Sequence, residues 1–354
     1  MSNYYRFQSQ YKYIHDELVP ALNEAGYIDL SDRINSCGHI IRVATCDDCG
    51  SKHFAGNASR CMSRFCPSCA RARSMAWCAR LLSFLDNWFS EGKHACELNF
   101  TITDTESLSD GIKILKDAFR YLLHDDKFSR NAMKKMFSGG FRSIEIKTGS
   151  GSGLWHVHMH CIVVKETYTR DFELVRQLWN RAVKAVGGKP GNTKSGELKY
   201  GSVYLHGFGK KTMLKNVMEV VKYITKMNWQ EESTARVREL VDNVKNLRNV
   251  QCWGVMYRLP KEVEEDLTAD ERSIKNKICR ICHCSELTLE RTWYNSEENL
   301  LDLDDSRDVS DGSVHTAPVP YDPVVGVQLQ IPLTRYGSLL EVEDDVREMV
   351  ERLV

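Results

Sequence analysis

Long apolar runs are missing from this sequence of 354 residues. No stretch reaches the roughly 18 consecutive apolar residues that a helix needs to cross a bilayer. The N-terminal stretch also lacks the apolar core of a secretory signal. An internal repeat is absent as well, which leaves no sign of a repeat architecture. These absences predict a cytoplasmic protein with no membrane partner.

The sequence also lacks a net charge, because 48 basic residues balance 48 acidic ones. The balance hides an asymmetry: residues 231–354 hold 15 Lys and Arg against 26 Asp and Glu, which leaves 33 against 22 in residues 1–230. A basic N-terminal part is typical of proteins that contact phosphates, and an acidic C-terminal part would limit non-specific binding. An ordinary surface charge distribution is the alternative.

Hydrophobic periodicity predicts helices and strands that alternate along the chain. The expected helices cover 5–35, 73–89, 107–124, 171–186 and 212–227, and the expected strands cover 95–103, 139–148, 154–165 and 201–208. From the first of these strands onward the order is β-α-β-β-α-β-α, in which long helices join the strands of one small sheet. This order predicts an α+β fold with helices packed on the sheet.

Composition divides the chain into five predicted segments. They are an N-terminal helical segment (1–36), a Cys-rich zinc-binding module with its exit helix (37–90), the α+β domain (91–230), a partly helical C-terminal region (231–295), and an acidic linker with a peripheral tail (296–354).

Thirteen cysteines are a high count for a chain expected in a reducing compartment, where thiolates bind metals more often than they form disulfides. Two Cys-x-x-Cys pairs, Cys46 with Cys49 and Cys66 with Cys69, are separated by sixteen residues. This spacing predicts that the four thiolates close one tetrahedral zinc site. Buried free thiols are the alternative.

Other cysteines lie close to these two pairs. Cys37 and Cys61, with His39 or His53, could complete a second zinc site, and the sequence leaves the ligand sets open. A weaker cluster consists of Cys279, Cys282, His283 and Cys284. It has no obvious partner pair, so the sequence does not favour zinc there.

Three histidines alternate with apolar residues in "WHVHMHCIVV" (155–164). On a strand, His156, His158 and His160 share one face, because side chains alternate with a period of two. Such a cluster predicts a metal site, since protonated imidazoles would repel one another. An antiparallel hairpin would bring Glu145 of the preceding strand beside the histidines. The alternative for Glu145 is an exposed strand residue.

A second motif, "EVVKYITK" (219–226), lies on an expected helix. Glu219, Tyr223 and Lys226 share one face there, being separated by four and three residues. A free tyrosine has a pKa of about 10 and is a poor nucleophile, but a nearby lysine and a metal-polarised phosphate could activate it. A half-buried packing tyrosine is the alternative.

Together the two motifs resemble those of the HUH superfamily of single-strand endonucleases. The similarity is greatest to initiators of rolling-circle plasmid replication, of the single-tyrosine type with an N-terminal zinc-binding module. "LNFTIT" (98–103) resembles their first motif, "WHVHMHCIVV" their histidine motif and "EVVKYITK" their third motif. In one plasmid family that third motif has a Glu four residues before the Tyr. The resemblance covers about residues 37–230 and leaves the C-terminal third unmatched.

The resemblance implies an antiparallel HUH endonuclease sheet, with a ferredoxin-like or RRM-like core and flanking helices, over 91–230. It implies that His158 and His160, with Glu145, hold Mg²⁺ or Mn²⁺ against the scissile phosphate. His156 is an additional histidine, which could be a third ligand, a DNA contact or a neighbour that orients the other two.

The resemblance also implies that Tyr223 attacks the phosphate, keeps the 5′ end as a phosphotyrosine and releases a 3′-hydroxyl that primes synthesis. Glu219 would then activate water or a new strand end to terminate the cycle. Lys215, Lys222 and Lys226 would contact DNA phosphates.

The implied partner is single-stranded or hairpin origin DNA. A host helicase and polymerase are further candidate partners, and homo-oligomerisation stays open. One alternative is a transposase or relaxase with the same chemistry. Another is a non-catalytic, zinc-stabilised DNA-binding regulator, in which the strand histidines are only packing. A third is a zinc-dependent hydrolase that uses the three histidines without a covalent intermediate.

Overall fold

The computed structural model describes residues 3–149, 151–167, 172–191, 202–222, 233–261, 282 and 287–294. These residues fall into two compact units. The first unit contains the described residues up to Arg73 together with 233–237, 282 and 287–294, and the second contains Ser74 to residue 222 together with 238–261. Within this described part, no helix is both long enough and apolar enough to cross a membrane.

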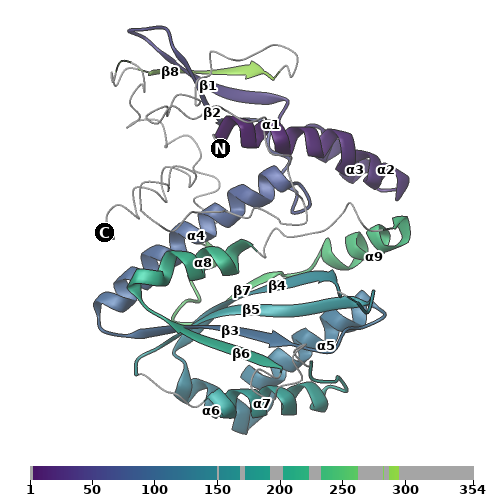
Figure 1. The fold of residues 1–354 in the computed structure, drawn as a ribbon, viewed down its shortest axis with the longest axis vertical. Helices are drawn as coiled ribbons and strands as arrows, with labels where there is room; N and C mark the ends of the chain where they lie inside the picture. The colour runs from purple at the N-terminus through teal and green to yellow at the C-terminus, as the bar shows by residue number, and fades with distance from the viewer. Residues whose placement is uncertain are drawn as a thin grey trace. The chain divides into compact units, whose positions relative to one another are not determined.

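The first unit combines N-terminal helices with a small antiparallel sheet (Figure 1). The helices are α1 (Asn3–Tyr13), which continues through a π-helical turn (Ile14–Leu18) into α2 (Val19–Glu24), and α3 (Ile28–Asn35). The strands are β1 (Ile40–Cys46), β2 (Lys52–Asn57) and β8 (Leu287–Trp293), in the order β2-β1-β8. The structure has helices over the range 5–35 where the sequence predicts them, whereas the three strands were not predicted.

The side chain of Phe7 packs α1 against this sheet. Its ring lies 5.0 Å from the ring of Phe54 in β2 and 5.1 Å from that of Tyr294, which follows β8 directly. Buried Ile41 and Val43 of β1 complete the cluster. The N-terminal helix and both outer strands therefore share one apolar core.

The second unit is built on a five-stranded antiparallel sheet in the order β6-β3-β5-β4-β7. Its strands are β3 (His94–Thr101), β4 (Gly139–Thr148), β5 (Trp155–Lys165), β6 (Val203–Phe208) and β7 (Val250–Gly254). The four predicted strands are confirmed to within two residues at each end. The fifth strand, β7, was not predicted, because a five-residue strand at the sheet edge is too short to give a clear alternation of apolar and polar residues.

Six helices accompany these strands in the described residues. They are α4 (Pro67–Ser90), α5 (Leu108–Arg120, extended by a π-helical turn at Tyr121–Asp125), α6 (Lys127–Met136), α7 (Phe172–Ala185), α8 (Met213–Lys222, preceded by a 3₁₀ turn at Lys210–Thr212) and α9 (Thr234–Val244). The expected start of α4 at residue 73 was wrong, because Pro67 is suited to the first turn of a helix. The helix α6 was not predicted, and the Asp126 side chain caps it by accepting from the Ser129 N–H at 2.8 Å.

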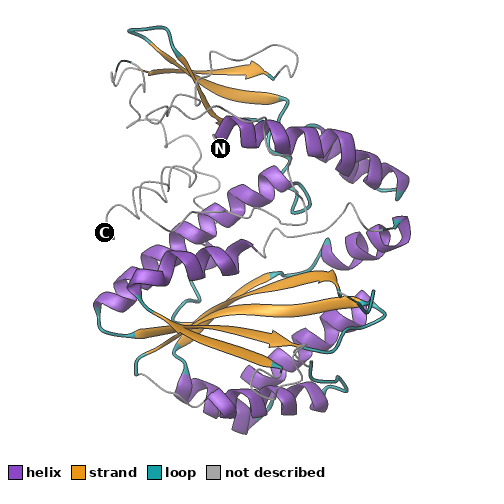
Figure 2. Ribbon diagram, viewed as in Figure 1, coloured by secondary structure: helices purple, strands orange, loops and turns teal. Residues whose placement is uncertain are grey.

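The sheet lies between two helical layers (Figure 2). On one face, Trp77 of α4 packs against Phe141 of β4 with 4.9 Å between ring centroids. On the other face, Phe100 of β3 packs against Trp179 of α7 at 4.6 Å. The α+β fold class, with antiparallel sheets and flanking helices, is confirmed.

Several predictions fall outside the described residues. They concern Tyr223 and Lys226, the expected end of their helix at residue 227, Cys279, His283 and Cys284, and the acidic linker and tail over 296–354.

Candidate metal centres

The hairpin of β4 and β5 brings a carboxylate and two imidazoles together. Glu145 is the register partner of His158, and Ser143 is the partner of His160, so all four side chains point to one face of the sheet. The Glu145 Oε2 atom lies 3.2 Å from the His160 Nε2 atom and also contacts the His158 Nε2 atom. One ligand atom from each of Glu145, His158 and His160 lies within 4.8 Å of the others. We call these three residues the histidine site.

Burial and mutual contact set the protonation of this site. Burial raises the pKa of Glu145, but hydrogen bonds from His158 and His160 outweigh it and hold that pKa well below its usual range. Burial also lowers the pKa of His158 to about 3, although the contact with Glu145 acts in the opposite direction. At neutral pH the pair is therefore a carboxylate beside a neutral imidazole, the form in which both groups can bind a cation.

The donor chemistry of the histidine site fits a divalent metal. Carboxylate oxygens suit Mg²⁺ and Mn²⁺, and imidazole nitrogens suit first-row transition metals. Three protein donors leave further positions for other ligands. The site could therefore bind a cation and an additional oxygen ligand together.

His156 points to the same face of β5 but lies outside the histidine site. Its Nδ1 atom is 2.6 Å from the Asp104 Oδ1 atom, and the Ser152 hydroxyl donates to the other oxygen of Asp104 at 2.6 Å. The position of Asp104 follows from the backbone, because Thr105 forms a β-bridge with Trp155 just beyond the end of β3. The prediction that His156 joins the metal ligands therefore has no support from the geometry, which pairs it with Asp104.

A second carboxylate lies near the histidine site. The Glu97 Oε1 atom of β3 is 4.0 Å from the His160 Nδ1 atom, and the Asn99 amide donates to the same oxygen at 3.3 Å. Glu97 is buried. Neither Glu97 nor Asp104 was predicted from the sequence. The signal for Glu97 was an acid between two apolar residues of a strand, Cys96 and Leu98, whereas Asp104 has no local signal because it follows the strand.

The last turn of α8 lies on the face that carries the histidine site. The Ser143 hydroxyl donates to the Val220 carbonyl at 3.2 Å, and the Ser74 hydroxyl of α4 donates to the Val221 carbonyl at 3.1 Å. Because Ser143 is the register partner of His160, these bonds fix the end of α8 over the middle of the sheet. Tyr223 follows directly after α8 in the sequence.

The other predicted residues of this region are distributed along α8. Glu219 is partly exposed in the last turn, Lys215 is exposed one turn earlier, and Lys222 ends the helix. The structure therefore brings Glu219 into the turn that the serine bonds hold, while Tyr223 and Lys226 lie outside the described residues.

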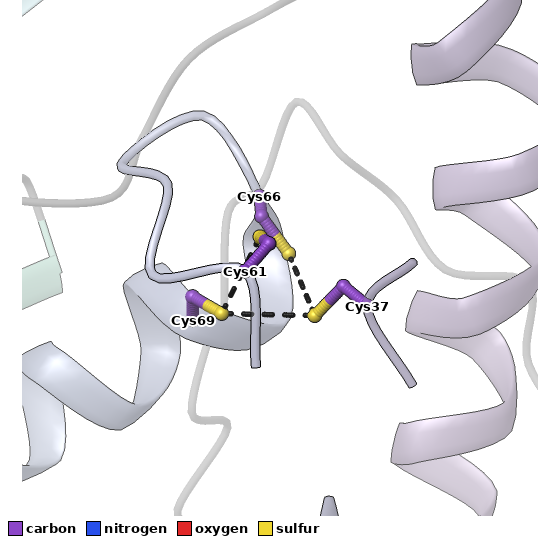
Figure 3. A group of neighbouring side chains, drawn as sticks. All are labelled: Cys37, Cys61, Cys66 and Cys69. Atoms are coloured by element: carbon purple, nitrogen blue, oxygen red, sulfur yellow. Dashed lines mark hydrogen bonds between the residues drawn. The ribbon is translucent and has the colours of Figure 1, made fainter. Parts of the chain in front are cut away.

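Four cysteines converge in the first unit (Figure 3). The Cys37 sulfur lies 3.6 Å from that of Cys69 and 3.5 Å from that of Cys66, and the sulfurs of Cys61 and Cys69 are 3.6 Å apart. Sulfurs around a tetrahedral zinc ion, each about 2.3 Å from the metal, would lie about 3.8 Å from one another. The four thiols, which we call the Cys37 cluster, could therefore bind zinc with little movement.

The structure groups the cysteines differently from the four-cysteine site that the spacing of the two Cys-x-x-Cys pairs allows. Cys66 and Cys69 join Cys37 and Cys61 instead of Cys46 and Cys49. The physical reason is β1, whose seven residues extend over about 20 Å and separate the position of Cys37 from that of Cys46. His39 and His53 are absent from the groups of possible ligands in the described residues.

Comparison with known proteins relates the chain to replication proteins. The chain matches the model of the Rep_1 replication protein family over residues 52–280. A curated relative named "Protein rep", from Streptococcus pneumoniae serotype 2 (strain D39 / NCTC 7466), is 26% identical over 174 residues, which cover 47% of this chain and 52% of the relative. The chain thus spans about half the length of the curated relative it matches. No solved structure matches it. The family match confirms the resemblance to replication initiators that the sequence motifs carry, and the chain belongs to the Rep_1 family of replication proteins.

Proposed function

We propose that this replication protein starts rolling-circle replication by nicking one strand of its origin through Tyr223. One observation carries the proposal: the histidine site and the end of α8, directly before Tyr223, lie on the same face of the sheet. Tyr223 follows that end of the helix directly in the sequence, and we expect its side chain to meet a phosphate bound at the site.

The proposed chemistry is a transfer of the phosphoryl group from one oxygen to another. The Tyr223 oxygen forms a bond to phosphorus, the bond from phosphorus to the 3′-oxygen breaks, and that oxygen leaves as a 3′-hydroxyl once protonated. The 5′ end stays on the tyrosine. Mg²⁺ or Mn²⁺ held by Glu145, His158 and His160 would offset the negative charge that develops on the phosphate. The neutral imidazole of His158 and the ionised Glu145 support this role.

Other side chains would serve the later steps and the DNA. Glu219, one turn before the tyrosine, would accept a proton from water or from a strand end at termination. The side chains of Lys215, Lys222 and Lys226 would contact backbone phosphates. His156, oriented by Asp104, would contact the DNA instead of the metal.

Structural zinc is part of the same proposal. The Cys37 cluster would hold one zinc ion that joins the segment before β1 to the start of α4. Cys66 and Cys69 lie at the N-terminal end of that helix, so the ion would fix where the helix begins.

The proposed partners are single-stranded or hairpin origin DNA, with a host helicase and polymerase acting after the nick. Transposases and relaxases are expected to use the same chemistry. The match to a replication protein family supports a role in replication over one in transposition or conjugation. The convergence of a carboxylate and two imidazoles at the histidine site favours a catalytic protein over a regulator without catalysis, in which those side chains would only pack.

A covalent adduct tests the proposal. We expect wild-type protein, incubated with labelled single-stranded origin DNA and Mn²⁺, to form a protein–DNA adduct that survives denaturation. We expect Tyr223→Phe to form none, whereas Tyr257→Phe, at an exposed tyrosine after β7, should form the adduct normally. An undiminished adduct in Tyr223→Phe would refute the nucleophile, and cleavage without any adduct would favour a metal-dependent hydrolase.

A further inference from the structure

A second sulfur cluster joins two parts of the chain that are far apart in sequence. The sulfurs of Cys46 and Cys282 lie 3.4 Å apart although 236 residues separate them. Cys49 completes the group, and the three sulfur atoms lie within 4.8 Å of one another. We call these three residues the Cys46 cluster. All of them belong to the first unit.

The backbone around Cys46 and Cys49 forms a tight turn between β1 and β2. The Gly50 N–H donates to the Cys46 carbonyl at 2.9 Å, and the Cys46 N–H donates to the Ser51 carbonyl at 2.8 Å. Gly50 has a φ of 71°, which few other residues adopt readily. The turn thus presents two sulfurs on one side, the arrangement that a Cys-x-x-Cys pair supplies to a metal.

The start of β8 is held against this turn. Leu287, the first residue of β8, is the register partner of Cys46. The Thr288 hydroxyl donates to the Asp47 carboxylate at 2.7 Å. Cys282 precedes Leu287 by only five residues in the sequence, so this pairing keeps it near the turn. The sulfur proximity therefore follows from strand pairing.

The exposure of two of the three cysteines distinguishes them from packing thiols, whereas Cys46 is buried. Cys49 and Cys282 are exposed, whereas cysteines that fill an apolar core are buried, as Cys78, Cys161 and Cys252 are here. The Ser51 hydroxyl lies 3.0 Å from the Cys49 sulfur. An exposed thiol that lies beside two other sulfurs is accessible to a metal ion from the solvent.

We propose that Cys46, Cys49 and Cys282 bind a second zinc ion, separate from the Cys37 cluster, that fastens β8 to the N-terminal hairpin. Three thiolates occupy three positions of a tetrahedral zinc ion and leave the fourth to a further donor. Thiolates select zinc over Mg²⁺ or Mn²⁺, so this ion differs in kind from the one proposed for the histidine site. Cys282 follows closely after residue 280, where the family match ends. The proposed ion therefore connects a residue beyond that match to the β1–β2 hairpin of the first unit.

The zinc content of wild type and of two variants tests the site. We expect wild-type protein, purified under reducing conditions, to hold one zinc ion per chain more than Cys282→Ser, as measured by native mass spectrometry. The control Cys252→Ala removes a buried thiol outside both clusters and should hold as much zinc as wild type. Because Cys282 is exposed, its replacement should not unfold the protein. Equal zinc content in wild type and Cys282→Ser would overturn the proposal, as would a disulfide between Cys46 and Cys282 in the intact mass.

Hydrogen exchange tests whether the ion holds β8 in place. We expect the amides of 287–294 to exchange about tenfold faster in Cys282→Ser than in wild type, because β8 would open locally without the zinc ion. The amides of β4 should not change. Unchanged exchange in β8 would show that strand pairing alone holds it and would overturn the fastening role. Neither measurement depends on DNA cleavage, so both can fail while the proposed nicking function stands.

Discussion

The histidine site and the cysteine clusters differ in how far apart their ligands lie along the chain. Glu145 and His160 are 15 residues apart, whereas Cys37 and Cys69 are 32 apart and Cys46 and Cys282 are 236 apart. The ladder between β4 and β5 positions the first pair before any cation binds. The cysteines come from separate elements, which a cation would join by closing long loops.

This difference predicts different roles for the cations. At a site that the hairpin has already assembled, a cation adds little to folding and can act on a bound phosphate. At the cysteine clusters, binding energy contributes directly to the stability of the folded state. Removing a ligand should therefore reduce activity in one case and stability in the other.

The largest expected effect is the loss of cleavage in His158→Gln. Glutamine retains a polar side chain but removes the Nε2 ligand, so the charge on the reacting phosphate would be offset less well. We expect the initial rate of origin cleavage with saturating Mn²⁺ to fall by roughly 10²–10³-fold. The thermal unfolding midpoint should change by only a few degrees, because the hairpin and its ladder remain.

The matched control is His124→Gln. His124 is exposed in the π-helical turn after α5 and does not belong to the histidine site. Its cleavage rate and unfolding midpoint should both equal those of wild type. An unimpaired rate in His158→Gln would mean that this side chain is structural and does not serve the reaction.

For Cys66→Ser we expect the main loss in stability, unlike His158→Gln, where the main loss is in activity. Serine would replace a buried thiolate of the Cys37 cluster, and losing one ligand of a structural zinc ion should lower the free energy of unfolding by roughly 3 kcal/mol. Denaturant unfolding followed by circular dichroism measures the change. The control Cys96→Ala removes a buried thiol of β3 outside both clusters and should cost only about 1 kcal/mol. Equal losses in the two variants would argue against zinc in the Cys37 cluster.

The same contrast explains what the sequence could predict. The residues of β4 and β5 follow a two-residue period on either side of a glycine-rich turn, and register then brings Glu145 opposite His158. The cysteine groups obey no such local rule. Their pairing depends on β1, which separates Cys46 from Cys37, and on β8, which returns from the far end of the sequence.

The position of Asp104 is less predictable from local sequence than the histidine site but more so than the cysteine clusters. Its substitution has the smallest expected effect. Asp104 follows β3 without a local pattern, yet a single β-bridge brings it to His156. We expect Asp104→Ala to lower the cleavage rate about tenfold, because His156 would lose the partner that orients it toward the DNA. Asp104→Asn retains an oxygen that can accept from the imidazole and should restore most of the rate. Mn²⁺ affinity should stay unchanged in both variants, because His156 lies outside the histidine site. Weaker Mn²⁺ binding in Asp104→Ala would instead place His156 among the metal ligands, and the histidine strand would then contribute three imidazoles to one cation.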